Sequence, residues 1–200
     1  IVLSSFEKNH LAKFTTSKIF TLPLILEVEE VINSFKERKD ILFIGGFQHK
    51  PNIDAVNYFI NEIWPLIFNS RPDLRFKIIG SNMPSEFKNI KIKGVEPVGF
   101  VEDLSPLLNN SILSISPLRY GAGIKGKIGT SLSHGLPVVA TKISAEGMEL
   151  ADGTNILIAN DSIDFANKVI KLSSDEKLWN KLSAHGVNFV KKNYSFDVID

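Results

Sequence analysis

Residues 112–141 read ILSISPLRYGAGIKGKIGTSLSHGLPVVAT, and they are the clearest indication of the fold class. A short apolar run at 112–115 leads into a glycine-rich loop, then into a helical pattern over 124–134, and then into a second apolar run at 138–141. Each apolar run has the length of a strand that is buried on both faces. Two such strands joined through a helix pair in parallel, so the stretch predicts an α/β fold with a parallel sheet.

The same alternation continues on both sides of this stretch. We expect further strands at 41–44, 76–79, 90–92 and 156–158, and helices from 51 onward and at about 102–109, 161–173 and 175–192. Repeated units of this kind specify a doubly wound, Rossmann-like parallel sheet with helices on both faces. Ligands of such sheets bind beyond the carboxyl ends of the strands, so the residues after each strand are the candidates for a site.

The chain divides at a charged segment. Residues 27–40 are mostly charged and lie between two apolar runs, so we predict a linker there and a Rossmann-like domain over 41–200. Two hundred residues with 44% hydrophobic side chains suit one such domain with an appendage, here residues 1–26. The chain starts without Met on an apolar run, and we expect it to be part of a longer polypeptide.

Composition excludes several classes of function. A net charge of +1 provides no basic surface for nucleic acid, so we predict no nucleic-acid partner. Without cysteine there are no disulfides, thiolate zinc sites or cysteine nucleophiles, and His10 and His185 lack the spacing of metal ligands, so no metal site is expected. No apolar stretch approaches the roughly 18 residues of a membrane span, and no basic signal-peptide region opens the chain. We predict a cytoplasmic protein without an integral membrane segment.

The loop after the 112–115 strand combines glycine with positive charge at the start of a helix. Backbone amides and the helix dipole attract a diphosphate there, and Lys125 and Lys127 add full charges beside the negative charge that develops on a leaving group. The spacing is that of neither a Walker A loop nor G-x-G-x-x-G. The alternative is a pair of solvated lysines on a mobile loop. The remaining candidates for ligand binding in this loop are Arg119, Gly121 and Gly123.

A second candidate loop follows the 41–44 strand. Gly45 and Gly46 let the backbone approach a ligand, and a helix begins shortly afterwards near Pro51. His49 lies in the same loop and is a candidate for contact with a phosphate. The alternative interpretation is a tight turn that requires glycine at positive φ.

Several motifs, in order and at consistent spacing over residues 41–197, resemble one family of enzymes. Together they are similar to the C-terminal, donor-binding domain of GT-B glycosyltransferases of family 4, also called group 1. The motifs are Gly45-Gly46-Phe47 with Pro51-Asn52-x-Asp54-Ala55, GFVEDL at 99–104, the Gly-x-Lys helix start followed by GLPVVAT at 135–141, DGTNILI at 152–158, and YSFD at 194–197.

The resemblance implies a retaining hexosyltransferase whose donor substrate is a nucleotide-diphosphate sugar and which needs no cofactor. Basic residues and a helix N-terminus replace a metal ion in this family, and the chain contains no Asp-x-Asp motif. The resemblance also places the backbone of Gly99 and Phe100 at the nucleotide base, and Gly45 and Gly46 under the sugar phosphate. It indicates a role in the synthesis of a bacterial-type polysaccharide or glycoconjugate.

The resemblance also implies what precedes the donor-binding domain. Residues 1–26 then end an N-terminal acceptor domain, with Pro23 near the crossover into the linker. Most of that domain is missing from this chain, and it is the expected partner.

Two positions depart from the family pattern. Family members typically carry two glutamates eight positions apart, and here those positions hold Ala122 and Thr130. At Thr130 a hydroxyl replaces a charged, bidentate acceptor for the ribose hydroxyls. This leaves an alternative function, a non-catalytic glycosyltransferase-like module with a decayed site that acts in protein interaction. A flavodoxin-like regulatory domain is a third possibility, but it gives no reason for the motifs.

Overall fold

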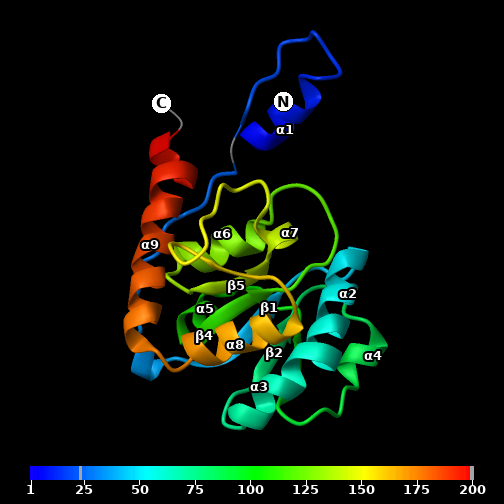
Figure 1. Ribbon diagram of the computed structural model, residues 1–200, viewed down its shortest axis with the longest axis vertical. Coiled ribbons are helices and arrows are strands. Elements are labelled where there is room, and N and C mark those ends of the chain that lie inside the picture. Colours follow the sequence, from blue (N-terminus) through cyan, green and yellow to red (C-terminus); the bar gives the residue numbers. More distant parts are fainter. Residues whose placement is uncertain (23, 199–200) are drawn as a thin grey trace.

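The computed structural model describes residues 1–22 and 24–198, and a six-stranded parallel sheet lies at its centre (Figure 1). The strand order is β3-β2-β1-β4-β5-β6, so the direction of winding reverses between β1 and β4. This order confirms the doubly wound α/β fold. The strands are β1 (Lys39–Ile44), β2 (Phe76–Ile79), β3 (Val95–Gly99), β4 (Ser111–Ser116), β5 (Val138–Thr141) and β6 (Leu157–Ala159).

Helices cover both faces of the sheet. Ile41, Leu42 and Phe43 are consecutive in β1, point to alternate faces, and are all fully buried. Ile41 and Phe43 belong to the larger core cluster, whereas Leu42 packs in a separate cluster with Leu108 and Leu136. The first face carries α2 (Lys50–Tyr58), which continues through a π-helical segment (Phe59–Ile63) into α3 (Trp64–Ser70), and α8 (Ser162–Leu172).

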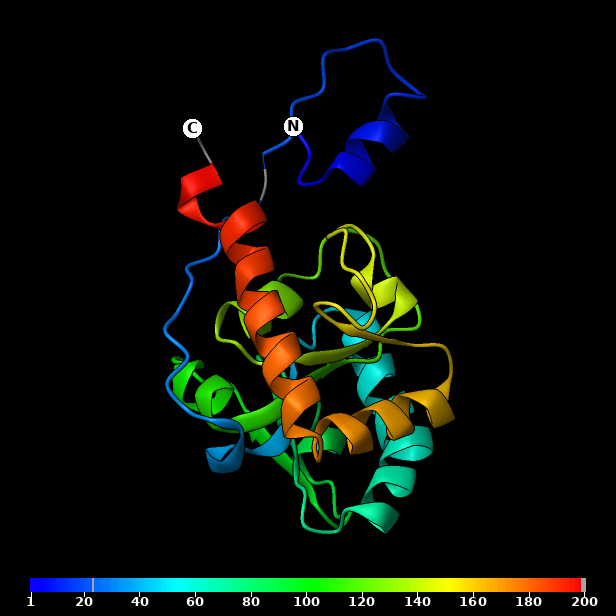
Figure 2. The same ribbon diagram turned by 60° about the vertical axis from the view of Figure 1, so that its left-hand side comes forward.

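The second face carries α5 (Ser105–Asn110) and α6 (Gly126–Ser133). The long helix α9 (Glu176–Tyr194) packs against α6 and extends toward the N-terminal segment (Figure 2). Two single-turn helices, α4 (Ser85–Lys88) and α7 (Lys142–Ala145), lie in the connections, and 3₁₀ turns occur at Phe35–Glu37 and Phe196–Val198.

One predicted strand is misplaced. Residues 90–92 form no strand, and β3 lies at Val95–Gly99 instead. Pro97 interrupts the strand pattern of the sequence, but β3 is an edge strand, where a proline is tolerated because one side of the strand needs no ladder hydrogen bond. Ile90 packs against the main core from a loop, which explains why its apolar neighbourhood resembles a strand.

Residues 1–22 project from the domain at the end where the α6 and α7 loops lie (Figures 1 and 2). They contain α1 (Ser5–Leu11), capped by the Ser4 side chain, and a parallel bridge between Val2 and Thr21. Pro23, the expected crossover, lies outside the described residues. The segment exposes several large apolar side chains, namely Ile1, Leu3, Phe6, Leu11, Phe14, Phe20 and Leu22.

The charged segment that follows runs along the domain surface. The Leu26 amide donates to the Tyr194 carbonyl at 2.6 Å, and the Glu29 amide donates to the Ser133 carbonyl at 3.1 Å. At its end the Arg38 guanidinium is buried and donates to the Leu108 carbonyl at 2.8 Å. Residues of the predicted linker are therefore bound to α5 and α6, and Leu26 just before the linker is bound to α9.

The carboxyl edge of the sheet leaves no room for a side chain at Gly80. A Cβ on Gly80 would overlap the carbonyl oxygen of Gly45, whereas a Cβ on Gly46 would lie 3.5 Å from the Ser81 hydroxyl, an ordinary contact. We expect Gly80→Ala to lower the free energy of unfolding by about 1–3 kcal/mol, because the two strand ends must separate. Gly46→Ala should stay within about 1 kcal/mol of wild type. Urea denaturation measures both, and equal losses would contradict this packing.

Candidate functional site

Two loops meet where the winding of the sheet reverses. Residues 45–49 connect β1 to α2, and residues 117–125 connect β4 to α6. Since β1 and β4 are parallel neighbours, with Ile41 opposite Leu113, both loops leave the same edge. Their helices lie on opposite faces of the sheet, so the loops border a crevice of the kind in which doubly wound sheets bind their ligands.

Lys127 lies in the first turn of α6 and points back to the first loop. Its ammonium donates to the Asn52 Oδ1 atom at 2.5 Å and lies 4.5 Å from the centre of the Phe43 ring. Burial, and to a smaller extent the neighbouring charge of Lys125, lower the pKa of Lys127 to about 7. Lys127 therefore changes its charge near neutral pH.

Lys125, at the N-cap position of α6, is 7% exposed. Its ammonium donates to the Gly123 carbonyl at 2.6 Å and to the Gly121 carbonyl at 3.3 Å. Gly121 and Gly123 have φ values of 118° and 79°, which glycine adopts without a Cβ penalty. Burial lowers the pKa of Lys125, and the charge of Glu146 acts in the opposite direction. The solvated loop considered as an alternative does not describe these two lysines, because both have partners within the protein.

In the first loop, close packing requires a glycine at Gly45. Gly45 and Gly46 do not have positive φ, and a Cβ on Gly45 would lie 2.8 Å from the Asn52 Cγ atom. The Asn52 amide also donates to the Gly46 carbonyl at 2.8 Å. His49 is exposed, and its side chain does not cap α2. Asn52 is not among the site residues predicted from the sequence, although it belongs to the Pro51-Asn52 motif.

Arg119 is held by α2. Its guanidinium forms an ion pair with Asp54, with Nε donating to Oδ2 at 2.9 Å, and lies 4.9 Å from the centre of the Tyr58 ring and 3.8 Å from Glu62. The hydrogen bonds from Arg119 lower the pKa of Asp54. Asp54, Tyr58 and Glu62 recur every four residues and so share one side of the helix. In this structure, then, Arg119 joins the second loop to α2.

The remaining candidates follow the same edge. Gly99 ends β3 with a φ of 88°, and its carbonyl accepts from the Gly80 amide at 2.8 Å. Phe100 beside it is 72% exposed. Thr130 is half-buried on α6, three residues after Lys127, so the two share one side of that helix. His134 is buried, and its Nδ1 lies 3.0 Å from the Thr130 carbonyl.

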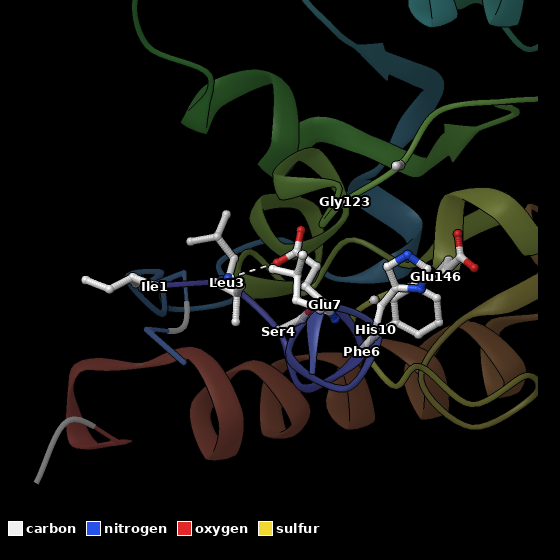
Figure 3. Close-up of a pocket in the computed structure, with 12 residues that line it drawn as sticks. Ile1, Leu3, Ser4, Phe6, Glu7, His10, Gly123 and Glu146 are labelled. Atoms are coloured by element: carbon white, nitrogen blue, oxygen red, sulfur yellow. Dashed lines mark hydrogen bonds between the residues drawn. The ribbon is translucent and has the colours of Figure 1, made fainter. Parts of the chain in front are cut away.

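A cavity of about 640 Å³ separates α1 from the glycine-rich loop (Figure 3). Apolar side chains of residues 1–11 form one wall, and Ala122, Gly123 and Gly147 lie opposite. Glu7, His10 and Glu146 also line it. The volume is within the range of small-molecule sites, and the cavity adjoins the loop that holds Lys125.

Within 1–22 and 24–198, no three His, Asp or Glu side chains gather in a way that could hold a metal ion. None of the helices in the same part of the chain has the length and apolar character needed to span a membrane.

The pKa of Lys127 makes anion binding depend on pH. We expect sulfate, whose charge is constant in this range, to bind more weakly as the pH rises from 7 to 9, by at most about tenfold per pH unit, because the protonated fraction of Lys127 falls. Lys127→Arg stays charged throughout and should retain its affinity. An NMR titration of the α6 amides measures both proteins, and a parallel loss of affinity would contradict the assignment.

The sequence matches a family of glycosyl transferases and a protein from a cps region. The model of the family described as "Glycosyl transferases group 1" matches residues 38–175. A 44.6 kDa protein from the cps region of Klebsiella pneumoniae is 25% identical over 164 residues, which make up 78% of this chain and 42% of that protein.

Two solved structures have the same fold. A variant of S. aureus TarM in complex with fondaparinux, alpha-GlcNAc-glycerol and UDP has a TM-score of 0.80 at 21% identity, over 98% of this chain and 41% of that one. The C-terminal domain of LpcC, a group 1 family glycosyl transferase from Francisella tularensis, has a TM-score of 0.65 at 20% identity, over 80% of this chain and 90% of that one. The chain thus spans less than half of TarM and of the Klebsiella protein, but most of the LpcC domain. Because the family model covers most of its length, the chain belongs to the group 1 glycosyl transferases and has the Rossmann-like fold of their GT-B C-terminal domain.

Proposed function

We propose that this chain is the donor-binding domain of a retaining, metal-independent hexosyltransferase that uses a nucleotide-diphosphate sugar. The observation that carries the proposal is the convergence of Lys125, Lys127 and the start of α6 on the crevice between β1 and β4. UDP is bound by the TarM variant that shares the fold, which supports a nucleotide ligand here. Retention and independence of metal rest on the family resemblance.

The diphosphate is the part of the donor that these residues suit. An ammonium has three hydrogen atoms to donate, and Lys127 directs one of them to Asn52 in the absence of a ligand. The N-terminal amides of α6 and the two lysines would stabilise the charge that grows on the leaving nucleotide as the glycosidic bond breaks. A bound diphosphate favours the protonated form of Lys127, so binding near neutral pH would take up a proton.

In this proposal, the sugar phosphate, the base and the ribose of the donor bind around the two lysines. Gly45 and Gly46 present backbone beside Lys127 for the sugar phosphate, with His49 at the rim of the same loop. The backbone of Gly99 and Phe100 takes the base, and Thr130 takes the ribose. Arg119 acts through the loop that it joins to α2.

The cavity beside α1 is the proposed place for the transferred sugar and the acceptor. Side chains of residues 1–11 form its outer wall. In this proposal residues 1–26 end the N-terminal acceptor domain, and 27–40 are the linker. The exposed apolar side chains of residues 1–22 support this, because that domain would cover them. The protein would act in the cytoplasm in the synthesis of a polysaccharide or glycoconjugate, as the similarity to a protein of a cps region suggests.

A non-catalytic module remains the second candidate function. Ala122 and Thr130, which stand where the family has glutamates, favour it. Burial makes the charge of Lys127 costly, and a site that no longer bound a phosphate would gain nothing from keeping such a residue. The environment of Lys127 therefore favours the enzyme.

Substitution of the two lysines tests the proposal in the polypeptide that includes the preceding domain. Lys125→Ala and Lys127→Ala should each lower kcat about 100- to 1000-fold, because a charge aimed at the leaving group acts mainly in the transition state. Thermal stability should change little. Sugar transfer from a panel of nucleotide sugars is the measurement, and Lys191→Ala, on the exposed side of α9, is the control. Wild-type kcat in both site variants would refute the diphosphate assignment.

Thr130 tests the position of the ribose. Thr130→Glu should tighten the binding of a ribonucleoside diphosphate relative to its 2′,3′-dideoxy analogue, since a carboxylate makes charge-assisted bonds roughly twice as strong as those of a hydroxyl. Calorimetric titration of wild type and Thr130→Glu with both ligands gives the difference in affinity between the two ligands for each protein. Repulsion between the new carboxylate and the diphosphate affects both ligands alike, so it cancels in this difference. Without a ribose-dependent gain, α6 does not face the ribose and the non-catalytic module becomes the better proposal.

A further inference from the structure

Asn52 is a buried polar side chain whose two ends have different partners. It is 8% exposed, in the first turn of α2. Its Nδ2 donates to the Gly46 carbonyl at 2.8 Å, and its Oδ1 accepts from the Lys127 ammonium at 2.5 Å. Because a carbonyl only accepts and an ammonium only donates, these partners allow a single orientation of the amide.

The amide is also fixed by packing. The backbone amide of Asn52 donates to the His49 carbonyl at 2.9 Å, which holds the start of α2. On the other side, Gly45 approaches so closely that a Cβ there would lie within 2.8 Å of the Asn52 Cγ. Asn52 therefore has little freedom to move away from Lys127.

Within the described part of the chain, the Lys127 ammonium has few other neighbours that could fix its position. Beside Asn52 it has the Phe43 ring, 4.5 Å away, and Lys125, a like charge that repels it. Lys125 uses its own hydrogen bonds on the carbonyls of Gly121 and Gly123. Asn52 is thus the polar group that fixes the direction of the Lys127 ammonium.

We propose that Asn52 is the positioning residue for Lys127, joining the β1–α2 loop to α6 so that the ammonium faces the diphosphate. This inference rests on the proposed function for its ligand, although the contact itself does not. Asn52 leaves two ammonium hydrogens free for phosphate oxygens and acts through Lys127 without touching the donor.

A double-mutant cycle with UDP as the probe tests the inference in the full chain. Asn52→Leu, which has nearly the same size but no polar atoms, should weaken UDP binding at least about tenfold in calorimetry, because the buried ammonium loses its partner. In a Lys127→Met background the same substitution should change affinity less than about twofold. Equal losses in both backgrounds, or no loss in either, would overturn the proposal. Asn193→Leu is the control, since it removes an exposed amide bond to the Phe189 carbonyl on α9.

The titration of Lys127 provides a second, ligand-free readout. Asn52→Asp places a carboxylate beside the ammonium and should raise the pKa of Lys127, whereas Asn52→Leu should lower it. NMR of the lysine side chain measures both, and unchanged titration in Asn52→Asp would overturn the contact even if Asn52→Leu did not fold. If wild type binds neither UDP nor another nucleoside diphosphate, the proposed function fails, while this titration still decides whether Asn52 holds Lys127.

Discussion

Burial of β1 on both of its faces determines where every other part of the site must lie. Ile41, Leu42 and Phe43 are enclosed from opposite sides, so helices must cover both faces of the sheet. Parallel strands are then joined by crossovers that bring all carboxyl ends to one edge. At β1 and β4 these crossovers go to opposite faces, and the two loops that leave them border one crevice.

This arrangement places positive charge where water is partly excluded. Lys127 lies against the Phe43 ring, and Lys125 is nearly covered by its own loop. Burial makes both charges costly, which lowers the pKa of each. A diphosphate bound at this point would favour the protonated lysines, because opposite charge at close range stabilises them.

Much of the fold could be predicted because its signals are local. The β1, β2, β4 and β5 strands each contain a short group of buried apolar residues, and their predicted positions agree with the structure to within two residues at either end. The β3 strand was misplaced because Pro97 and Gly99 lack the signal of a strand, and only its place at the edge of the sheet permits them. Gly45 and Gly46 were predicted to let the backbone approach a ligand, and this stays a prediction. What the structure adds is that the Asn52 side chain packs against Gly45.

Residue type, periodicity and spacing along the chain were enough to predict the parallel sheet, the strand ends around the candidate site, and the two lysines at the start of α6. Which side chains meet depends instead on the three-dimensional fold. Asn52 and Lys127 are 75 residues apart, and Arg119 and Asp54 are 65 apart. These pairs form because β4 lies directly beside β1 in the sheet. The lowered pKa of Lys127 has the same origin, since desolvation depends on the atoms that surround a charge and not on its neighbours in sequence.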